Sequence, residues 1–138
     1  MGHANLIDAL VYIEANFDKT VSLAQLADLS ALSVSRFATV FREQFGLSPY
    51  KYLCELRVRR AQTLLLAGVS GSVVATEVGF FDQSHLARHF KRLCGMTPSA
   101  FVERTQKKAR SAELDAGLSK RVAQNRPRAF AFDSAHAA

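Results

Sequence analysis

The chain repeats itself with an offset of 49 residues, and this repeat constrains the fold more than any other feature of the sequence. Residues of the same class recur at ten positions within one window, which chance rarely produces. The repeat therefore indicates two copies of one supersecondary unit. The matching pairs are Ser35 with Ser84, Phe37 with Leu86, Ala38 with Ala87, Phe41 with Phe90, Arg42 with Lys91, Gly46 with Gly95, Leu47 with Met96, Ser48 with Thr97, Pro49 with Pro98, and Tyr52 with Phe101.

Apolar residues recur with the 3.6-residue period of amphipathic helices along most of the chain. The stripe over residues 5–17 predicts a first helix. Ser22 followed by Gln25 has the spacing of a capping box, so we expect a short second helix to begin there.

The longer helix of the first copy carries signals at both of its ends. Ser33 is a candidate N-cap, and Gly46 is a residue that can end the helix in a left-handed conformation. Ser48 and Pro49 then begin a helix predicted over residues 49–66, because proline suits the first helical position. No segment alternates with period two for long, and the predicted fold is all-α with seven helices.

In each copy a short helix with a central alanine, Ala27 or Ala75, precedes a turn and a longer helix. The small alanine lets the two helices approach closely, as in a helix-turn-helix motif. We expect these motifs over about 22–45 and about 72–94, with a turn one residue longer in the second.

The outward positions of the two longer helices are short, polar or basic, and none is acidic. A generic solvated helix face would usually include glutamates, so this composition favours a face that contacts DNA. Glu43, just beyond the first face, weakens the pattern. The outward residues are Ser35, Arg36, Ala38, Thr39 and Arg42 in the first copy, and Gln83, Ser84, His85, Ala87, Arg88, Lys91 and Arg92 in the second.

The charge distribution agrees with a polyanionic partner. The 138 residues carry a formal net charge of +6, and the basic excess lies in the second half of the chain. Residues 1–50 sum to −2, whereas residues 51–104 and 105–138 each sum to +4. A basic domain usually binds nucleic acid, although charge alone is weak evidence.

These residues resemble the DNA-binding domain of the AraC/XylS family of bacterial transcription regulators. The most specific part is GFFDQSHLARHFKRLCGMTPSAF at 79–101, which is similar to the family signature GF-x-x-x-S-x-(F/L)-x-R-x-F-K-x-x-x-G-x-(T/S)-P. Residues 49–66 are similar to the family's linker helix. The resemblance implies a DNA-binding domain over residues 1–104, with two helix-turn-helix subdomains joined by the linker helix.

The same resemblance implies a transcription activator whose partners are promoter DNA and RNA polymerase. A linker of about 18 residues spans roughly 27 Å, so one monomer is expected to present its two recognition helices to successive major grooves. Only a few residues of this sequence precede the predicted first helix, so we expect either a short single-domain activator or part of a longer regulator, and a monomer on DNA unless a sensor domain outside this sequence dimerises. The alternative is a protein-interaction module of the same fold that modulates RNA polymerase or another regulator without reading DNA.

Seven outward residues are candidates for contacts with bases. Arg88 is the strongest, because its guanidinium can bond guanine O6 and N7 together; the alternatives are a phosphate contact or an intramolecular salt bridge. Gln83 suits adenine, with N-terminal capping as the alternative. Ser84 and Ser35 can bond bases or phosphates, or assist capping, and His85 either contacts a base edge or is a surface histidine without a DNA contact. The predicted base-reading residues are Ser35, Arg36, Thr39, Gln83, Ser84, His85 and Arg88.

Four basic residues are expected to contact phosphates, which gives affinity without sequence information. These are Arg42, Lys51, Lys91 and Arg92. Arg57, flanked by core positions, is expected to be structural, with a DNA contact as the alternative. His89 is expected at the edge of the core.

Other chemistry finds little support in the sequence. Helical spacing places Phe37, Phe41, Phe45, Phe80, Phe81, Phe90 and Phe101 in the core instead of in a base-stacking surface. No catalytic cluster, metal site or cofactor motif can be argued from four scattered histidines and two cysteines. No membrane segment is present, and the thiols suit a reducing cytoplasm.

Residues 105–138 form a basic, alanine-rich tail outside the resemblance. We expect its first part to extend the last helix up to about Asn125, Pro127 to end that helix, and the remainder to be disordered. The tail is either an auxiliary arm on the DNA backbone or a dispensable solvated extension.

Overall fold

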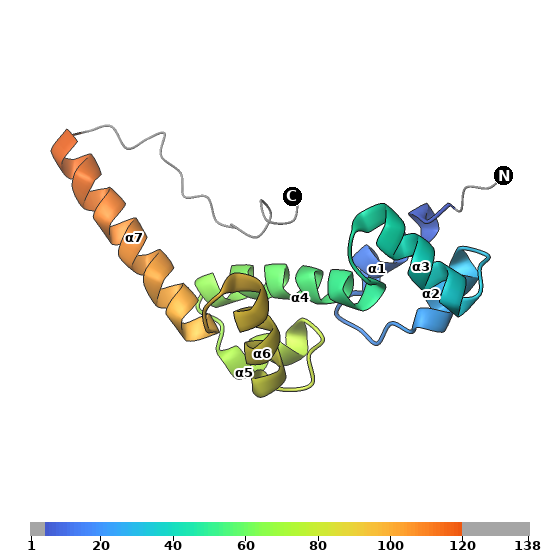
Figure 1. Cartoon of the computed structure of the whole chain (residues 1–138). Helices are drawn as coiled ribbons and strands as arrows, with labels where there is room; N and C mark the ends of the chain where they lie inside the picture. Colours follow the sequence, from blue (N-terminus) through green and yellow to red (C-terminus); the bar gives the residue numbers. More distant parts are fainter. Residues whose placement is uncertain (1–4, 120–138) are drawn as a thin grey trace.

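The computed structural model of the protein describes residues 5–119, and within this range the chain forms seven α-helices and no β-strand. The all-α prediction is therefore confirmed. Figure 1 shows two compact helical modules joined by a long helix, with a second long helix projecting from one module. The helices are α1 (Ile7–Asn16), α2 (Leu23–Leu29), α3 (Val34–Phe45), α4 (Pro49–Leu66), α5 (Gly71–Glu77), α6 (Gln83–Cys94) and α7 (Pro98–Ser119).

Serine side chains cap the helices where the sequence predicts them. Ser22 Oγ accepts from the Gln25 N–H at 3.0 Å, and the Gln25 side chain accepts from the Ser22 N–H at 3.2 Å, which completes the capping box. Ser33 and Ser48 accept from the N–H groups three residues on, at 3.1 Å and 3.2 Å. Each cap satisfies an N–H group that has no partner within its own helix.

The structural repeat follows the sequence repeat closely. Helices α3 and α6 both contain 12 residues, and each ends at a left-handed glycine, Gly46 with φ 80° or Gly95 with φ 77°. Pro49 and Pro98 then begin α4 and α7. The same local signals thus build the same unit twice.

The apolar residues gather in two separate cores. The first module consists of α1, α2, α3 and the start of α4, and the second consists of α5, α6, the rest of α4 and the start of α7. Within α4, Leu53 belongs to the first core and its neighbour Cys54 to the second. The first core contains Leu6, Ala9, Ile13, Leu26, Ala27, Phe37, Val40, Phe41 and Leu53; the second contains Cys54, Val58, Ala61, Leu65, Val74, Ala75, Val78, Phe80, Leu86, Phe90 and Phe101.

Most of the phenylalanines pack inside, as predicted, but Phe81 does not. Phe37, Phe41 and Phe90 are fully buried, whereas Phe81 is 84% exposed. Phe81 lies in the longer turn before α6, where Phe80 already fills the core position. Assigning Phe81 to the core was therefore wrong, because its place in a turn frees it from the helical period.

Helix α7 continues beyond the part of the chain that the resemblance covers. Phe101, near its start, packs in the second core, and most side chains from residue 103 onward are exposed. The predicted helical extension of the tail is confirmed as far as Ser119. The predicted continuation to Asn125 and the end at Pro127 lie outside the described residues. Among the helices of residues 5–119, none is long and apolar enough to cross a membrane.

Candidate nucleic-acid interface

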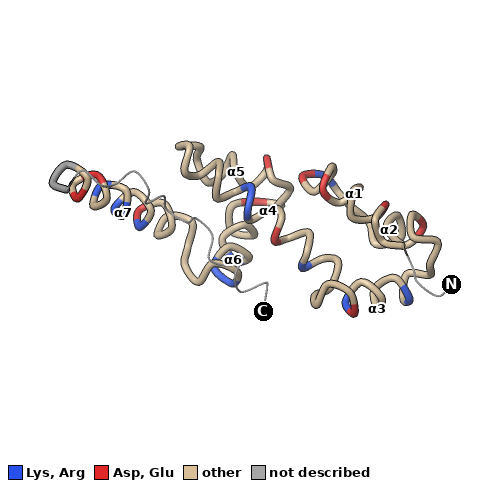
Figure 2. Tube along the Cα trace, turned by 90° about the horizontal axis from the view of Figure 1, so that it is seen from above, with Lys and Arg blue, Asp and Glu red and all other residues tan. Residues whose placement is uncertain are grey.

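The longer helix of each repeat lies on the same side of the molecule. Figure 2 shows α3 and α6 along one edge, with α1, α2 and α5 on the other side of α4. Helix α3 packs against α2 and α6 against α5, so each longer helix buries one face within its module. The outer faces are left uncovered on a shared side.

Helix α3 presents all of its predicted contact residues to solvent. Ser35, Arg36, Thr39 and Arg42 are exposed. The Thr39 hydroxyl donates to the Ser35 carbonyl at 3.1 Å, one turn earlier, so Thr39 offers its methyl group and an acceptor outward. Lys51, in the first turn of α4, is also exposed.

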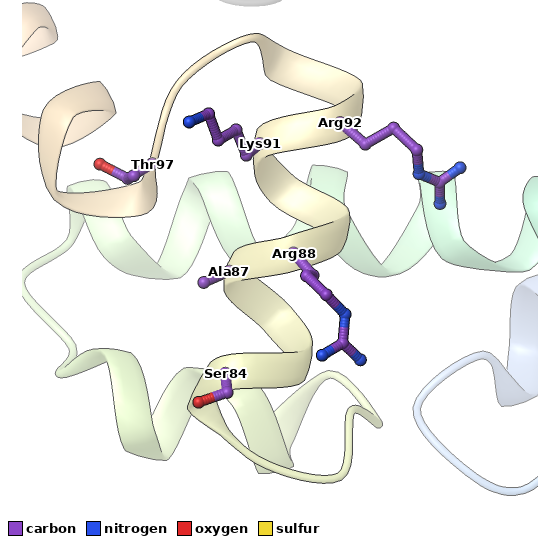
Figure 3. A pocket seen from close by; sticks show the side chains of 6 residues that line it. All are labelled: Ser84, Ala87, Arg88, Lys91, Arg92 and Thr97. Atoms are coloured by element: carbon purple, nitrogen blue, oxygen red, sulfur yellow. The ribbon is translucent and has the colours of Figure 1, made fainter.

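Helix α6 brings four of its predicted contact residues together on one shallow, open depression. Ser84, Arg88, Lys91 and Arg92 line it with Ala87 and Thr97. Figure 3 shows Arg88 and Arg92 extending from one edge of α6, and Lys91 from the opposite edge toward Thr97. Gln83, at the start of α6, is exposed as well.

Capping is carried out by residues other than the predicted contact residues. Asp82 Oδ1 accepts from the His85 N–H at 2.9 Å and caps α6, just as Ser33 caps α3. The capping alternative for Gln83, Ser84 and Ser35 is therefore not realised.

The position of Gln83 depends on a glycine in the neighbouring helix. A Cβ atom at Gly71 would lie 2.6 Å from Gln83 Nε2, so the Gln83 amide rests against the bare backbone of α5. Helix α5 begins at Gly71, one residue before the predicted start, because Ser70 caps it. The absence of a side chain at Gly71 thus lets the start of α6 pack closely on α5.

The two histidines of α6 pack along its inner edge. His85 Nδ1 accepts from the Phe81 N–H at 3.1 Å, which leaves His85 Nε2 as the free ring nitrogen. His89 stacks on Phe80 with ring centroids 5.2 Å apart, and Arg92 Nη2 lies 2.6 Å from His89 Nδ1. Burial, followed by the positive charge of Arg92, lowers the pKa of His89 to about 4. His89 is half-buried and neutral, which confirms its predicted place at the core edge.

Arg88 forms no ion pair within the part of the chain that the structure describes. Within residues 5–119, no carboxylate lies within 4.0 Å of the Arg88 guanidinium. The salt-bridge alternative for Arg88 is therefore not found in the described structure, and its charge remains available to an anion.

One residue of this surface was missed by the sequence reasoning. Thr97 borders the depression and caps α7, since its Oγ1 accepts from the Ala100 N–H at 3.2 Å. Its repeat partner Ser48 caps α4 in the same way, so the repeat itself could have indicated Thr97.

Comparison with known proteins agrees with this architecture. Residues 26–104 match the model of a helix-turn-helix domain family. The chain is 34% identical over 91 residues to the probable transcriptional regulator LumQ of Photobacterium leiognathi, covering 65% of this chain and 37% of LumQ. It is 35% identical over 89 residues to the arabinose operon regulatory protein of Escherichia coli K12, covering 64% of this chain and 29% of that protein. The chain thus spans about a third of the length of these relatives.

The fold is also similar to a solved protein–DNA complex. The DNA-binding domain of AdpA, a global transcriptional factor crystallised with a target DNA, superposes with a TM-score of 0.70 at 26% identity. The match covers 77% of this chain and 96% of that domain.

Proposed function

Because the chain belongs to the AraC/XylS family of helix-turn-helix DNA-binding domains, we propose that it is a sequence-specific regulator that inserts α3 and α6 into successive major grooves of duplex DNA. One observation supports this proposal: two equivalent helices present mainly polar and basic outer faces on the same side of the molecule, with Glu43 at the edge of the first face as the one exposed carboxylate of the two helices. The length of α4, 18 residues or roughly 27 Å, suits adjacent grooves about 34 Å apart if the DNA bends slightly.

The N-terminal parts of α3 and α6 supply the base contacts in this proposal. Arg88 pairs with guanine O6 and N7, and Gln83 with adenine. His85 can donate only from Nε2, since Nδ1 already accepts a hydrogen bond. On α3, Thr39 offers its methyl group to a thymine methyl. Ser35, Arg36 and Ser84, which are all exposed, complete the proposed base-reading set, in which His85 is only partly exposed.

The remaining basic residues contact phosphates. Arg42, Lys91 and Arg92 lie toward the C-terminal ends of the recognition helices, where a helix leaves the groove, and Lys51 lies at the start of α4. Such contacts fix the protein on the duplex and make its affinity depend on salt.

The wider role follows from the family resemblance. We expect a cytoplasmic activator that binds promoter DNA as a monomer and contacts RNA polymerase there. Each module has its own recognition helix, so one chain suffices for an asymmetric site of two segments.

Selection from a pool of random duplexes tests the proposal directly. The chain should enrich a site with two preferred segments whose centres lie about 10–11 base pairs apart. A variant with Arg88, Lys91 and Arg92 all replaced by alanine is the control and should enrich nothing comparable. Failure of the unmodified chain to enrich any sequence at low salt would refute DNA reading and favour a protein-interaction module.

A further inference from the structure

The two modules share one helix, and this connection alone would hold them loosely. In the first half of α4, Leu53 and Leu56 pack in the first core, whereas Cys54 and Val58 pack in the second. A single shared helix can bend and twist, so the angle between modules would vary unless a second contact, away from the helix axis, fixes it. The structure contains such a contact.

Arg57 of α4 reaches from the second module into the first. Its Nε donates to the Phe17 carbonyl at 2.6 Å, and its Nη2 donates to the Lys19 carbonyl at 3.0 Å. Both carbonyls belong to the segment that follows α1, and Phe17 is the C-cap of that helix. A guanidinium suits this position, because the carbonyls at a helix C-terminus attract positive charge.

The other side of the same guanidinium faces the second module. Arg57 Cζ lies 5.6 Å from the centre of the Phe80 ring, a cation–π distance. Phe80 in turn stacks on His89 of α6. Contacts therefore run without a break from the end of α1, through Arg57 and Phe80, to the second recognition helix.

Gly79 lies directly against Arg57 and the Phe17 carbonyl, so the two modules are in close contact at this point. A Cβ atom at Gly79 would lie 2.9 Å from Arg57 Nε and 3.0 Å from the Phe17 carbonyl oxygen. The turn before α6 thus lies against the segment after α1, with the guanidinium between them. Gly79 also has φ +99°, which favours glycine independently.

The side chain of Arg57 is almost fully enclosed at this junction. Arg57 is only 6% exposed, which confirms that it is structural and leaves it out of reach of DNA. Burial lowers the pKa of its guanidinium. The Phe17 and Lys19 carbonyls and the Phe80 ring replace the water that this charge has lost.

We propose that Arg57 is a positioning residue that fixes α6 relative to α3 and thereby sets the spacing of the two DNA segments that the protein accepts. This inference rests on the proposed function for its DNA part. When one of two rigidly linked modules has bound its DNA segment, the other meets a correctly spaced second segment at a high effective concentration. Flexibility between the modules lowers this effective concentration and the affinity that it adds.

Residual dipolar couplings of backbone amides test the rigid connection without DNA. In the unmodified protein, both modules should fit one alignment tensor. In Arg57→Met, which keeps the apolar stem but loses both hydrogen bonds and the charge, the modules should give tensors of different magnitude. Arg57→Lys keeps the charge, but its ammonium is not a planar two-bond donor. The difference between its two module tensors should therefore be smaller than in Arg57→Met and larger than in the unmodified protein. Arg60→Met is the matched control, because Arg60 is exposed on the same helix.

Binding to DNA with altered spacing tests the consequence. Inserting one base pair between the selected segments should weaken the unmodified protein and Arg60→Met about tenfold, since it shifts and rotates one groove. The same insertion should cost Arg57→Met less than about threefold, while its affinity for each separate segment stays unchanged.

Two results would overturn the inference. One is separate alignment tensors for the two modules of the unmodified protein, a result that no folding defect of a variant can explain. The other is an Arg57→Met protein that keeps the single tensor and the full spacing penalty. Absence of any selected site would instead refute the proposed function, and the dipolar couplings would still decide whether Arg57 holds the modules together.

Discussion

Replacing Phe90 by alanine should remove a central part of the second core. Phe90 is fully buried on the inner face of α6, and its ring packs edge-on against Phe101 with centroids 5.4 Å apart. Truncating a buried phenylalanine costs about 3–5 kcal/mol through lost burial and the cavity that remains. Whole domains are stable by only about 5–15 kcal/mol, so this loss is a large share of the total.

The separation of the two cores sharpens this prediction. Phe90 belongs to the second core and its repeat partner Phe41 to the first, and both are fully buried. Phe90→Ala should therefore increase amide hydrogen exchange mainly in α5 and α6, and Phe41→Ala mainly in α1–α3. Urea unfolding of both variants, together with exchange measured by NMR, provides the test. A melting temperature for Phe90→Ala within about 2 °C of the unmodified protein would refute the inner-face assignment.

Three smaller predictions concern titration, thiol reactivity and backbone strain. Burial and the Arg92 charge lower the pKa of His89 from 6.5 to about 4, so the unfolded chain gains a proton that the folded domain does not. The free energy of unfolding, measured with urea, should fall as the pH is lowered from 6.5 toward 4. His89→Gln should make this pH dependence weaker, and an unchanged pH dependence would contradict the lowered pKa of His89. Burial raises the pKa of the Cys54 thiol, and it raises the pKa of the Cys94 thiol to about 11. At pH 8, Ellman's reagent should therefore react far more slowly with the folded protein than with the unfolded chain. Equal reaction rates would exclude buried thiols. Ala31 has φ 57°, so Ala31→Gly should raise the unfolding free energy by about 0.5–1 kcal/mol, and a decrease would show that the turn is not strained.

The helices and their ends could be predicted because their causes are local. Ser22, Ser33 and Ser48 cap the helices that follow them, and Gly46 ends α3, as the sequence indicates. The repeat extended these signals to Gly95 in the second copy. Caps, glycines and apolar periodicity act over a few residues, so one sequence is enough to recognise them.

The features that the sequence did not reveal depend on contacts between distant residues. Phe81 and Phe80 are adjacent and chemically identical, and only the packing of the turn decides which of them is buried. The partners of Arg57 lie about 40 positions away and are backbone carbonyls, which carry no side-chain signature. Residue identity alone could not assign this junction.

The most direct test of DNA reading compares Arg88→Ala with Arg92→Ala. Both arginines line one depression on α6, and Arg88 lies one turn nearer the N-terminal end of the helix (Figure 3), which in the proposed binding mode enters the groove. Arg92→Ala should weaken selected and scrambled duplexes alike and lower the salt slope by about one. Neither variant should change the melting temperature much, because both side chains are exposed.

The decisive measurement is the affinity of Arg88→Ala for the selected duplex and for a scrambled duplex of the same length, taken at several salt concentrations. We predict a loss of about 1–3 kcal/mol on the selected duplex, relaxed preference at one or two base pairs, and little change on the scrambled one. An equal loss on both duplexes would make Arg88 a phosphate contact. No loss on either would mean that the outer face of α6 is not the surface that binds DNA.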